Sequence, residues 1–140
     1  MSNRQKEIIG LVLITFSILS IISLFGHDIT ENPMGLPDNY IPANYLGLFG
    51  VYISHYHYQI LGYTSIIFPI IFTYLGYILL AKKEIKSSLK LIIFTLSIGW
   101  FLSTLMGFIA HITANDDLVN YFSGSIGWFS SEFLMIFLGS

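Results

Sequence analysis

Three long runs of apolar residues, each without a charged side chain, divide the sequence: residues 8–25, 63–81 and 91–110. A transmembrane helix needs roughly 20 apolar residues to cross a hydrocarbon core about 30 Å thick. Lipid offers the backbone no hydrogen-bond partners, so each run should be helical despite its many Ile, Phe and Tyr residues. The pattern therefore predicts an all-α membrane protein with three transmembrane helices.

A second pattern is an internal repeat, because residues 47–62 resemble residues 124–139 at a constant offset without a gap. The paired identities are Gly47 with Gly124, Gly50 with Gly127, Ser54 with Ser131, Leu61 with Leu138, and Gly62 with Gly139. In the first copy the apolar run 63–81 follows directly. By the same order, a fourth transmembrane helix is expected to start at about Ser140 in a longer parent protein.

Charge is scarce and unevenly placed. Charged residues make up 10% of the chain, against about a quarter in a soluble domain, and the net charge of −2 hides their distribution. Segments 26–62 and 111–140 contain no Lys or Arg. The six basic residues precede the first run or separate the second from the third: Arg4, Lys6, Lys82, Lys83, Lys86 and Lys90.

Short basic segments stay in the cytoplasm, so the N-terminus is expected inside and the repeats are expected to run parallel across the membrane. The first repeat, residues 1–81, is then a transmembrane helix at 8–25, an outer loop at 26–44, an interfacial helix at 45–62 and a transmembrane helix at 63–81. The second, residues 82–140, is a cytoplasmic loop at 82–90, a transmembrane helix at 91–110, an outer loop at 111–122 and an interfacial helix at 123–139.

The segment 45–62 is apolar enough to be mistaken for another crossing. A crossing there would move the lysines of 82–90 outside, against the positive-inside rule. The segment also mixes polar side chains with several Tyr residues, which favour the headgroup level. We therefore expect a helix in the outer interface, and the same for 123–139, with a re-entrant element packed between crossing helices as the alternative.

Few residues are candidates for chemistry, and no catalytic, cofactor-binding or metal-binding residue is assigned. His55 and His57 would form a plausible metal-binding pair on a strand, where both point the same way. On a helix they diverge, so we expect water-facing interfacial residues. His27 and His111 follow outward-running helices and are expected to cap their free carbonyls. Solvated loop charges are expected at Asp28, Asp116 and Asp117. The chain has no cysteine and no phosphate-binding GxxxxGK[ST] motif.

A set of small and apolar residues resembles the N-terminal membrane domain of FtsK/SpoIIIE-type DNA translocases. The residues that carry it are Gly50, Ser54, Leu61, Gly62 and Pro69, then Gly124, Gly127, Ser131, Glu132, Leu138 and Gly139, with Glu7 to Leu11 and Gly26-His27-Asp28. The family commonly has an acidic residue where this chain has His55, although Glu132 keeps an acid in the second copy.

The resemblance implies a four-span anchor in the bacterial cytoplasmic (inner) membrane, for a cytoplasmic hexameric motor that pumps double-stranded DNA through the division septum. It also implies that ATP, Mg and DNA bind outside this chain, which would localise and oligomerise the motor and contact division proteins. The chain alone is then expected to have no enzymatic activity. A small polytopic transporter or membrane-complex subunit without a motor is the alternative, although its predicted spans lack the ionisable residues that transporters usually carry there.

Overall fold

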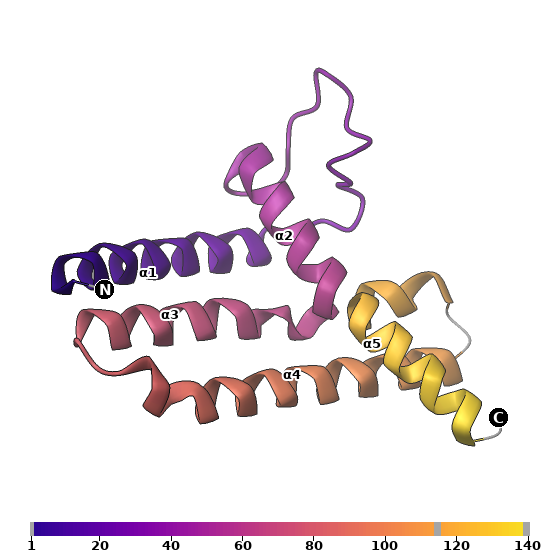
Figure 1. The fold of residues 1–140 in the computed structure, drawn as a ribbon. Helices are drawn as coiled ribbons and strands as arrows, with labels where there is room; N and C mark the ends of the chain where they lie inside the picture. Colours follow the sequence, from indigo (N-terminus) through magenta and orange to yellow (C-terminus); the bar gives the residue numbers. More distant parts are fainter. Residues whose placement is uncertain (1, 114–115, 139–140) are drawn as a thin grey trace.

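The computed structural model describes residues 2–113 and 116–138, and the side chains of all these except 116–120. Every regular element in these residues is helical (Figure 1). The elements are α1 (Asn3–Phe25), α2 (Gly47–Leu61), a 3-10 helix η1 (Gly62–Ile66), α3 (Ile67–Leu80), α4 (Ile85–Ile112) and α5 (Asp116–Leu138). The predicted all-α class is therefore confirmed.

Helices α1, α3 and α4 lie side by side, while α2 and the last part of α5 run obliquely across one end of that set (Figure 1). By length and hydropathy, three stretches of the described chain can cross a membrane: Asn3–Phe25, Gly47–Leu80 and Ile85–Ile112. The second combines α2, η1 and α3 in 34 residues, about 51 Å if it were one straight helix. The chain instead bends at Gly62, where φ is +59°, so η1 and α3 alone run alongside α1.

The first and third spans are longer at their starts than the apolar runs suggested. α1 begins five residues before the predicted position 8, because Ser2 and Gln5 form a reciprocal capping box at its first turn. α4 begins at Ile85, so the predicted loop 82–90 is too long: Lys86 and Lys90 belong to the helix. A charged residue is compatible with the first turns of a transmembrane helix where these reach beyond the hydrocarbon.

Two other boundaries differ from the prediction. The crossing predicted at 63–81 begins as a 3-10 turn, and Pro69 is the third residue of α3, where a missing N–H costs no helical hydrogen bond. It therefore acts near a helix start and does not kink the span. The outer loop predicted at 111–122 is wrong, because α4 continues to Ile112 and α5 starts at Asp116. Within α5, the backbone angles of Gly124 are non-helical, and the helix kinks there.

The contact between α1 and α3 depends on two small residues that face each other. A Cβ on Gly10 would lie 2.8 Å from the carbonyl oxygen of Gly76, and a Cβ on Gly76 would lie 2.7 Å from that of Gly10. Further along the same contact, the rings of Phe16 and Phe72 meet edge to face, with centroids 5.5 Å apart. Close backbone approach of this kind is the usual way for helices to associate in lipid, where apolar side chains gain little by leaving the solvent.

Candidate functional site

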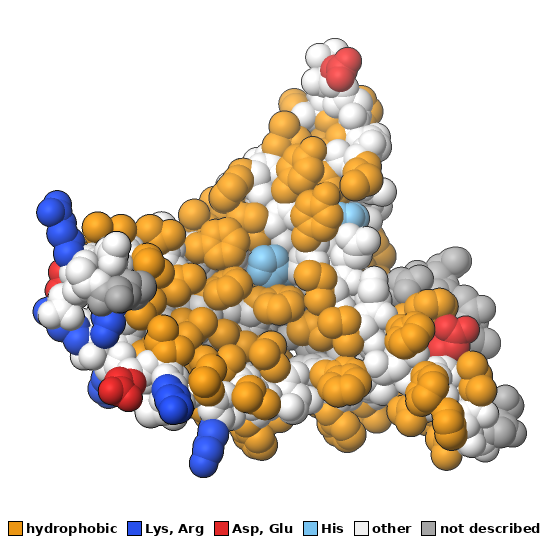
Figure 2. Space-filling view, viewed as in Figure 1, with side chains coloured by type: hydrophobic (Ala, Val, Ile, Leu, Met, Phe, Trp, Pro, Cys, Tyr) orange, Lys and Arg blue, Asp and Glu red, His pale blue; other side chains and the backbone are white. Residues whose placement is uncertain are grey.

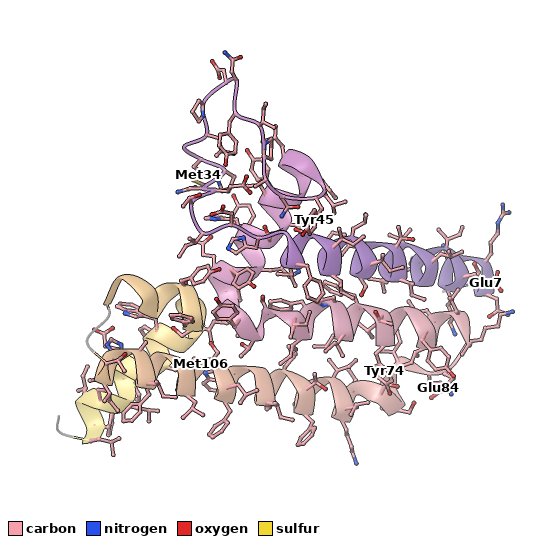
Figure 3. The ribbon with its side chains drawn as sticks, turned by 180° about the vertical axis from the view of Figure 1, so that it is seen from behind. Glu7, Met34, Tyr45, Tyr74, Glu84 and Met106 are labelled. Atoms are coloured by element: carbon pink, nitrogen blue, oxygen red, sulfur yellow. The ribbon has the colours of Figure 1, made fainter. Side chains whose placement is uncertain are left out.

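The basic residues gather at one end of the three aligned helices. Figure 2 shows the Lys and Arg side chains there, beyond a body covered mainly by apolar side chains. Figure 3 shows Glu7 and Glu84 at this same end, far from Met34 and Tyr45 in the loop between α1 and α2. Lys82 Nζ lies 2.9 Å from Glu7 Oε1. Both side chains are about half exposed, so this pair joins the two segments but adds little stability.

We call the six residues Arg4, Lys6, Lys82, Lys83, Lys86 and Lys90 the basic end. The fold thus brings together residues that the sequence placed in two separate segments, with α2 and α5 at the opposite end (Figure 1). That polarity is the feature on which the predicted orientation depends.

The first glycine of each repeat copy has a positive φ. Gly47, at the start of α2, has φ +61°, and its partner Gly124 has φ +63°. Residues with a side chain rarely adopt such angles. Gly62 also has positive φ, at +59°, whereas its partner Gly139 lies outside the described residues. The sequence repeat is therefore accompanied by a positive φ at the first glycine of each copy.

The two repeats meet at Gly62 and Gly124. A Cβ on Gly62 would lie 2.1 Å from the carbonyl oxygen of Phe122, and a Cβ on Gly124 would lie 2.5 Å from the amide nitrogen of Gly62. Both distances are shorter than any real carbon contact, and the atoms met belong to the backbone. These two glycines therefore let the backbones of the repeats touch, and we call this contact the glycine seam.

The second pair of glycines makes room for different neighbours. A Cβ on Gly50 would meet Asn44 Oδ1 at 1.8 Å, and a Cβ on Gly127 would meet the carbonyl oxygen of Ser103 at 2.3 Å. The paired serines make the same kind of hydrogen bond. Ser54 Oγ and Ser131 Oγ each donate to the carbonyl three residues earlier, at 3.2 and 2.8 Å. Both serines are buried, so small size is what packing requires at these positions.

Serine hydroxyls tie α1 and α4 each to the element that follows it. Ser23 Oγ of α1 donates to the carbonyl of Gly50 at 2.5 Å. In the second repeat Ser103 Oγ of α4 donates to the carbonyl of Ser123. Both hydroxyls are fully buried. Bonds of this kind hold helices together in lipid, typically by about 0.6 kcal/mol each.

A cluster of rings, which we call the aromatic junction, joins the exit of α1 to α2 and α5. It consists of His27, Tyr58, Tyr63, Tyr121 and Phe122. The His27 ring stacks on Tyr58 with centroids 4.1 Å apart, and Tyr58 and Tyr121 lie 5.5 Å apart and nearly parallel. His27 Nδ1 lies 3.1 Å from Ser54 Oγ. One histidine therefore contacts both repeats.

The setting of His27 favours its neutral form. Burial lowers the pKa of His27 below its usual 6.5, and His55 lowers it further, while Asp28 and Glu31 partly offset the shift. Burial also raises the pKa of Tyr121, helped by the hydroxyl of Tyr63. A proton on His27 would have to enter a stack of rings beside a second histidine, which costs free energy because a charge loses hydration there.

An open cleft of about 340 Å³ lies over the aromatic junction. Its lining joins the loop after α1 to α2 and α5: His27, Ile29, Asn32, Met34, His55, Tyr58, Gln59 and Tyr121. Among the side chains that the structure describes, no group of three or more His, Asp or Glu residues is placed to hold a metal ion. The described lining of the cleft thus offers rings and amides but no metal-holding group.

Three of the four histidines do not behave as the sequence suggested, while His55 lines the open cleft. His27 does not cap α1; the Asn44 amide does, donating to the carbonyls of Ser23 and Gly26 at 2.9 and 3.1 Å. His57 is not a water-facing residue, since its ring meets Phe68 edge to face and its Nδ1 lies 2.7 Å from the carbonyl of Ile53. His111 lies within α4 and its Nε2 is buried without a hydrogen bond.

One loop residue, Glu31, carries more of the structure than its sequence context indicated. Glu31 is 1% exposed, and its Oε1 accepts from the hydroxyl of Tyr40 at 3.0 Å and from the amide of Ala43 at 2.5 Å. Asp28 is an ordinary loop charge that accepts from Thr30. The side chains of Asp116 and Asp117 lie outside the described set. The available sequence signal for the structural role of Glu31 was its position near Pro33 and Pro42 in a turn-rich segment.

Three aligned apolar helices with one basic end, cross-tied by buried serines and glycines, define a multi-span helical membrane domain without a catalytic centre among its described side chains. The family model described as the 4TM region of DNA translocase FtsK/SpoIIIE matches residues 2–140. The chain therefore belongs to that family, and it is the membrane anchor region of an FtsK/SpoIIIE-type translocase. No curated protein and no solved structure matches it.

Proposed function

We propose that this chain holds an ATP-driven DNA translocase at the division septum of a bacterium, gathers its copies, and thereby supports chromosome segregation. The observation that carries the proposal is the family match over residues 2–140. A membrane anchor acts by restricting a soluble motor to a surface, so it needs a defined orientation and no chemistry of its own. ATP, Mg and DNA would bind the motor alone.

The basic end supports the orientation that such an anchor requires. A motor that uses ATP and chromosomal DNA works in the cytoplasm, and short segments rich in Lys and Arg stay on that side. The N-terminus and the turn between α3 and α4 would then be cytoplasmic. The loop of residues 26–46, with α2 and α5, would face outward, where it is available to other division proteins.

A chimera of the full-length protein tests the proposal. In the variant, the four-span region is replaced by an unrelated four-span anchor of the same orientation, and the motor carries a fluorescent tag. We expect the natural protein to concentrate at the septum and the chimera to spread over the membrane, with a segregation defect although its motor retains ATPase activity. Equal septal concentration of both proteins would refute a localising role for this region.

A further inference from the structure

The helices α1 and α4 carry the same pair of serines at the same spacing. Phe16-Ser17-Ile18 matches Leu96-Ser97-Ile98, and six residues after each serine come Ser23 and Ser103. The later serines do equivalent work, since each is buried and donates to a backbone carbonyl of the element that follows its helix. The two helices can therefore be compared position by position, with Ser17 as the counterpart of Ser97.

The earlier serines differ. Ser17 is fully buried, and its Oγ donates to the carbonyl of Pro69 at 2.6 Å and lies 2.6 Å from Thr73 Oγ1, both on α3. Ser97 is exposed, and its Oγ donates to the carbonyl of Ile93 in its own helix at 2.9 Å. A serine can bond back to a carbonyl of its own helix in this way. Within the part of the chain that the structure describes, α4 therefore has no counterpart of the Ser17 bonds to α3.

A groove surrounds Ser97. It has a volume of about 410 Å³ and runs between α4 and the end of α5. Trp100, Phe101, Thr104 and Leu105 line it from α4, and Leu134 from α5. Lipid can cover apolar side chains of this kind, but a channel between two helices, with a hydroxyl at one edge, also has the shape and chemistry that receive a third helix.

We propose that this groove is the seat of the fourth transmembrane helix of the family's four-span region, and that Ser97 donates to the backbone of that helix as Ser17 donates to Pro69. Two observations select this occupant. The family is a four-span region, whereas three stretches of the described chain qualify as spans. In the first repeat, the helix that follows α2 packs against α1, so the helix that follows α5 packs against α4.

The repeat also supplies the register. The offset between Gly47 and Gly124 places the counterpart of Pro69 at position 146 of the parent and that of Thr73 at position 150. In the first repeat these two residues are one turn apart on the face of α3 that contacts Ser17. Ser97 therefore meets the fourth helix within its first two turns.

Disulfide mapping in the full-length protein, in its native membrane and without other cysteines, tests this seat. Ser97→Cys is combined with single cysteines at each of positions 143–152 of the parent. The pair Ser17→Cys and Thr73→Cys is the positive control, because these side chains touch. Leu102→Cys is the negative control: it is on α4 and 39% exposed, but does not line the groove.

We expect Ser97→Cys to form intramolecular disulfides at one or two positions near 146 and 150, with yields at least tenfold above those of Leu102→Cys. Cross-links between two chains through Ser97→Cys would show that a second copy fills the groove and would overturn the proposal. So would the absence of any cross-link at these ten positions when the control pair reacts, because the groove would then face lipid.

Discussion

The glycine seam makes a quantitative prediction, because Gly47 and Gly124 both have positive φ but differ in their surroundings. Nothing lies within 4 Å of a Cβ placed on Gly47, whereas one on Gly124 would meet Gly62 N at 2.5 Å and the carbonyl of Ile60 at 2.6 Å. Gly47→Ala therefore suffers only backbone strain. Gly124→Ala suffers strain and also a collision with backbone atoms of the other repeat.

The magnitudes separate the two variants. Positive φ costs a residue with a side chain about 1–2 kcal/mol, which is the expected loss for Gly47→Ala. At Gly124, ψ is 177°, a region open essentially to glycine alone, at a cost of about 1–3 kcal/mol. Overpacking adds about 1–3 kcal/mol. We therefore expect Gly124→Ala to lower the free energy of unfolding by about 2–6 kcal/mol.

The assay is reversible unfolding of the purified chain in mixed micelles, with increasing SDS and helicity followed by far-ultraviolet circular dichroism. Gly35→Ala is the matched control, because Gly35 has no positive φ and no atom within 4 Å of its Cβ. Its unfolding should shift by less than about 0.5 kcal/mol. If Gly124→Ala proves no more damaging than Gly47→Ala, the repeats do not meet at the glycine seam.

Three further predictions follow from other parts of the structure. The lowered pKa of His27 means that the folded state binds fewer protons than the unfolded state. Stability should therefore be full above pH 6.5 and fall as the pH drops from there toward the pKa of the folded state. His27→Gln should weaken this loss, and an unchanged pH profile would contradict it. His57→Ala should lower the free energy of unfolding by about 1 kcal/mol, because it loses the hydrogen bond to the Ile53 carbonyl, and His55→Ala should lower it less. The purified chain should contain no stoichiometric zinc; zinc that disappears when both histidines are changed to Ala would refute this. An impermeant thiol reagent should label Asn39→Cys in intact cells but Ser87→Cys only after permeabilisation; the reverse pattern would overturn the orientation.

Periodicity and charge were enough to predict the three apolar helices, because lipid leaves the backbone no alternative to helix. The repeat was also visible, because Gly47 and Gly124 both have a positive φ that favours glycine. Boundaries were less accessible. Asp116 opens a helix in a segment that its Asn and Asp residues marked as a loop, and Asp is favoured in the first turn of a helix as well as in turns.

The cross-ties could not be predicted, because they join positions far apart in the sequence. Nothing near Asn44 indicates that it caps α1, eighteen residues away from Gly26. Likewise, the sequence shows Ser23 and Ser103 only as small residues in apolar runs. The carbonyl to which each donates comes close only in the folded chain. His57 was misjudged for the same reason: a helical wheel gives its direction, but Phe68 lies across the bend at Gly62.

The central claim is that this chain belongs to a four-span anchor whose motor lies in the cytoplasm. The most direct measurement extends the chain along its natural reading frame and fuses a reporter that is active only in the cytoplasm after residue ~170, beyond a span of roughly 20 residues. The account predicts an active reporter there and an inactive one when the fusion is made at Leu138. An inactive reporter after residue ~170, in a fusion that is stably expressed, would contradict both the fourth helix and the placement of the motor.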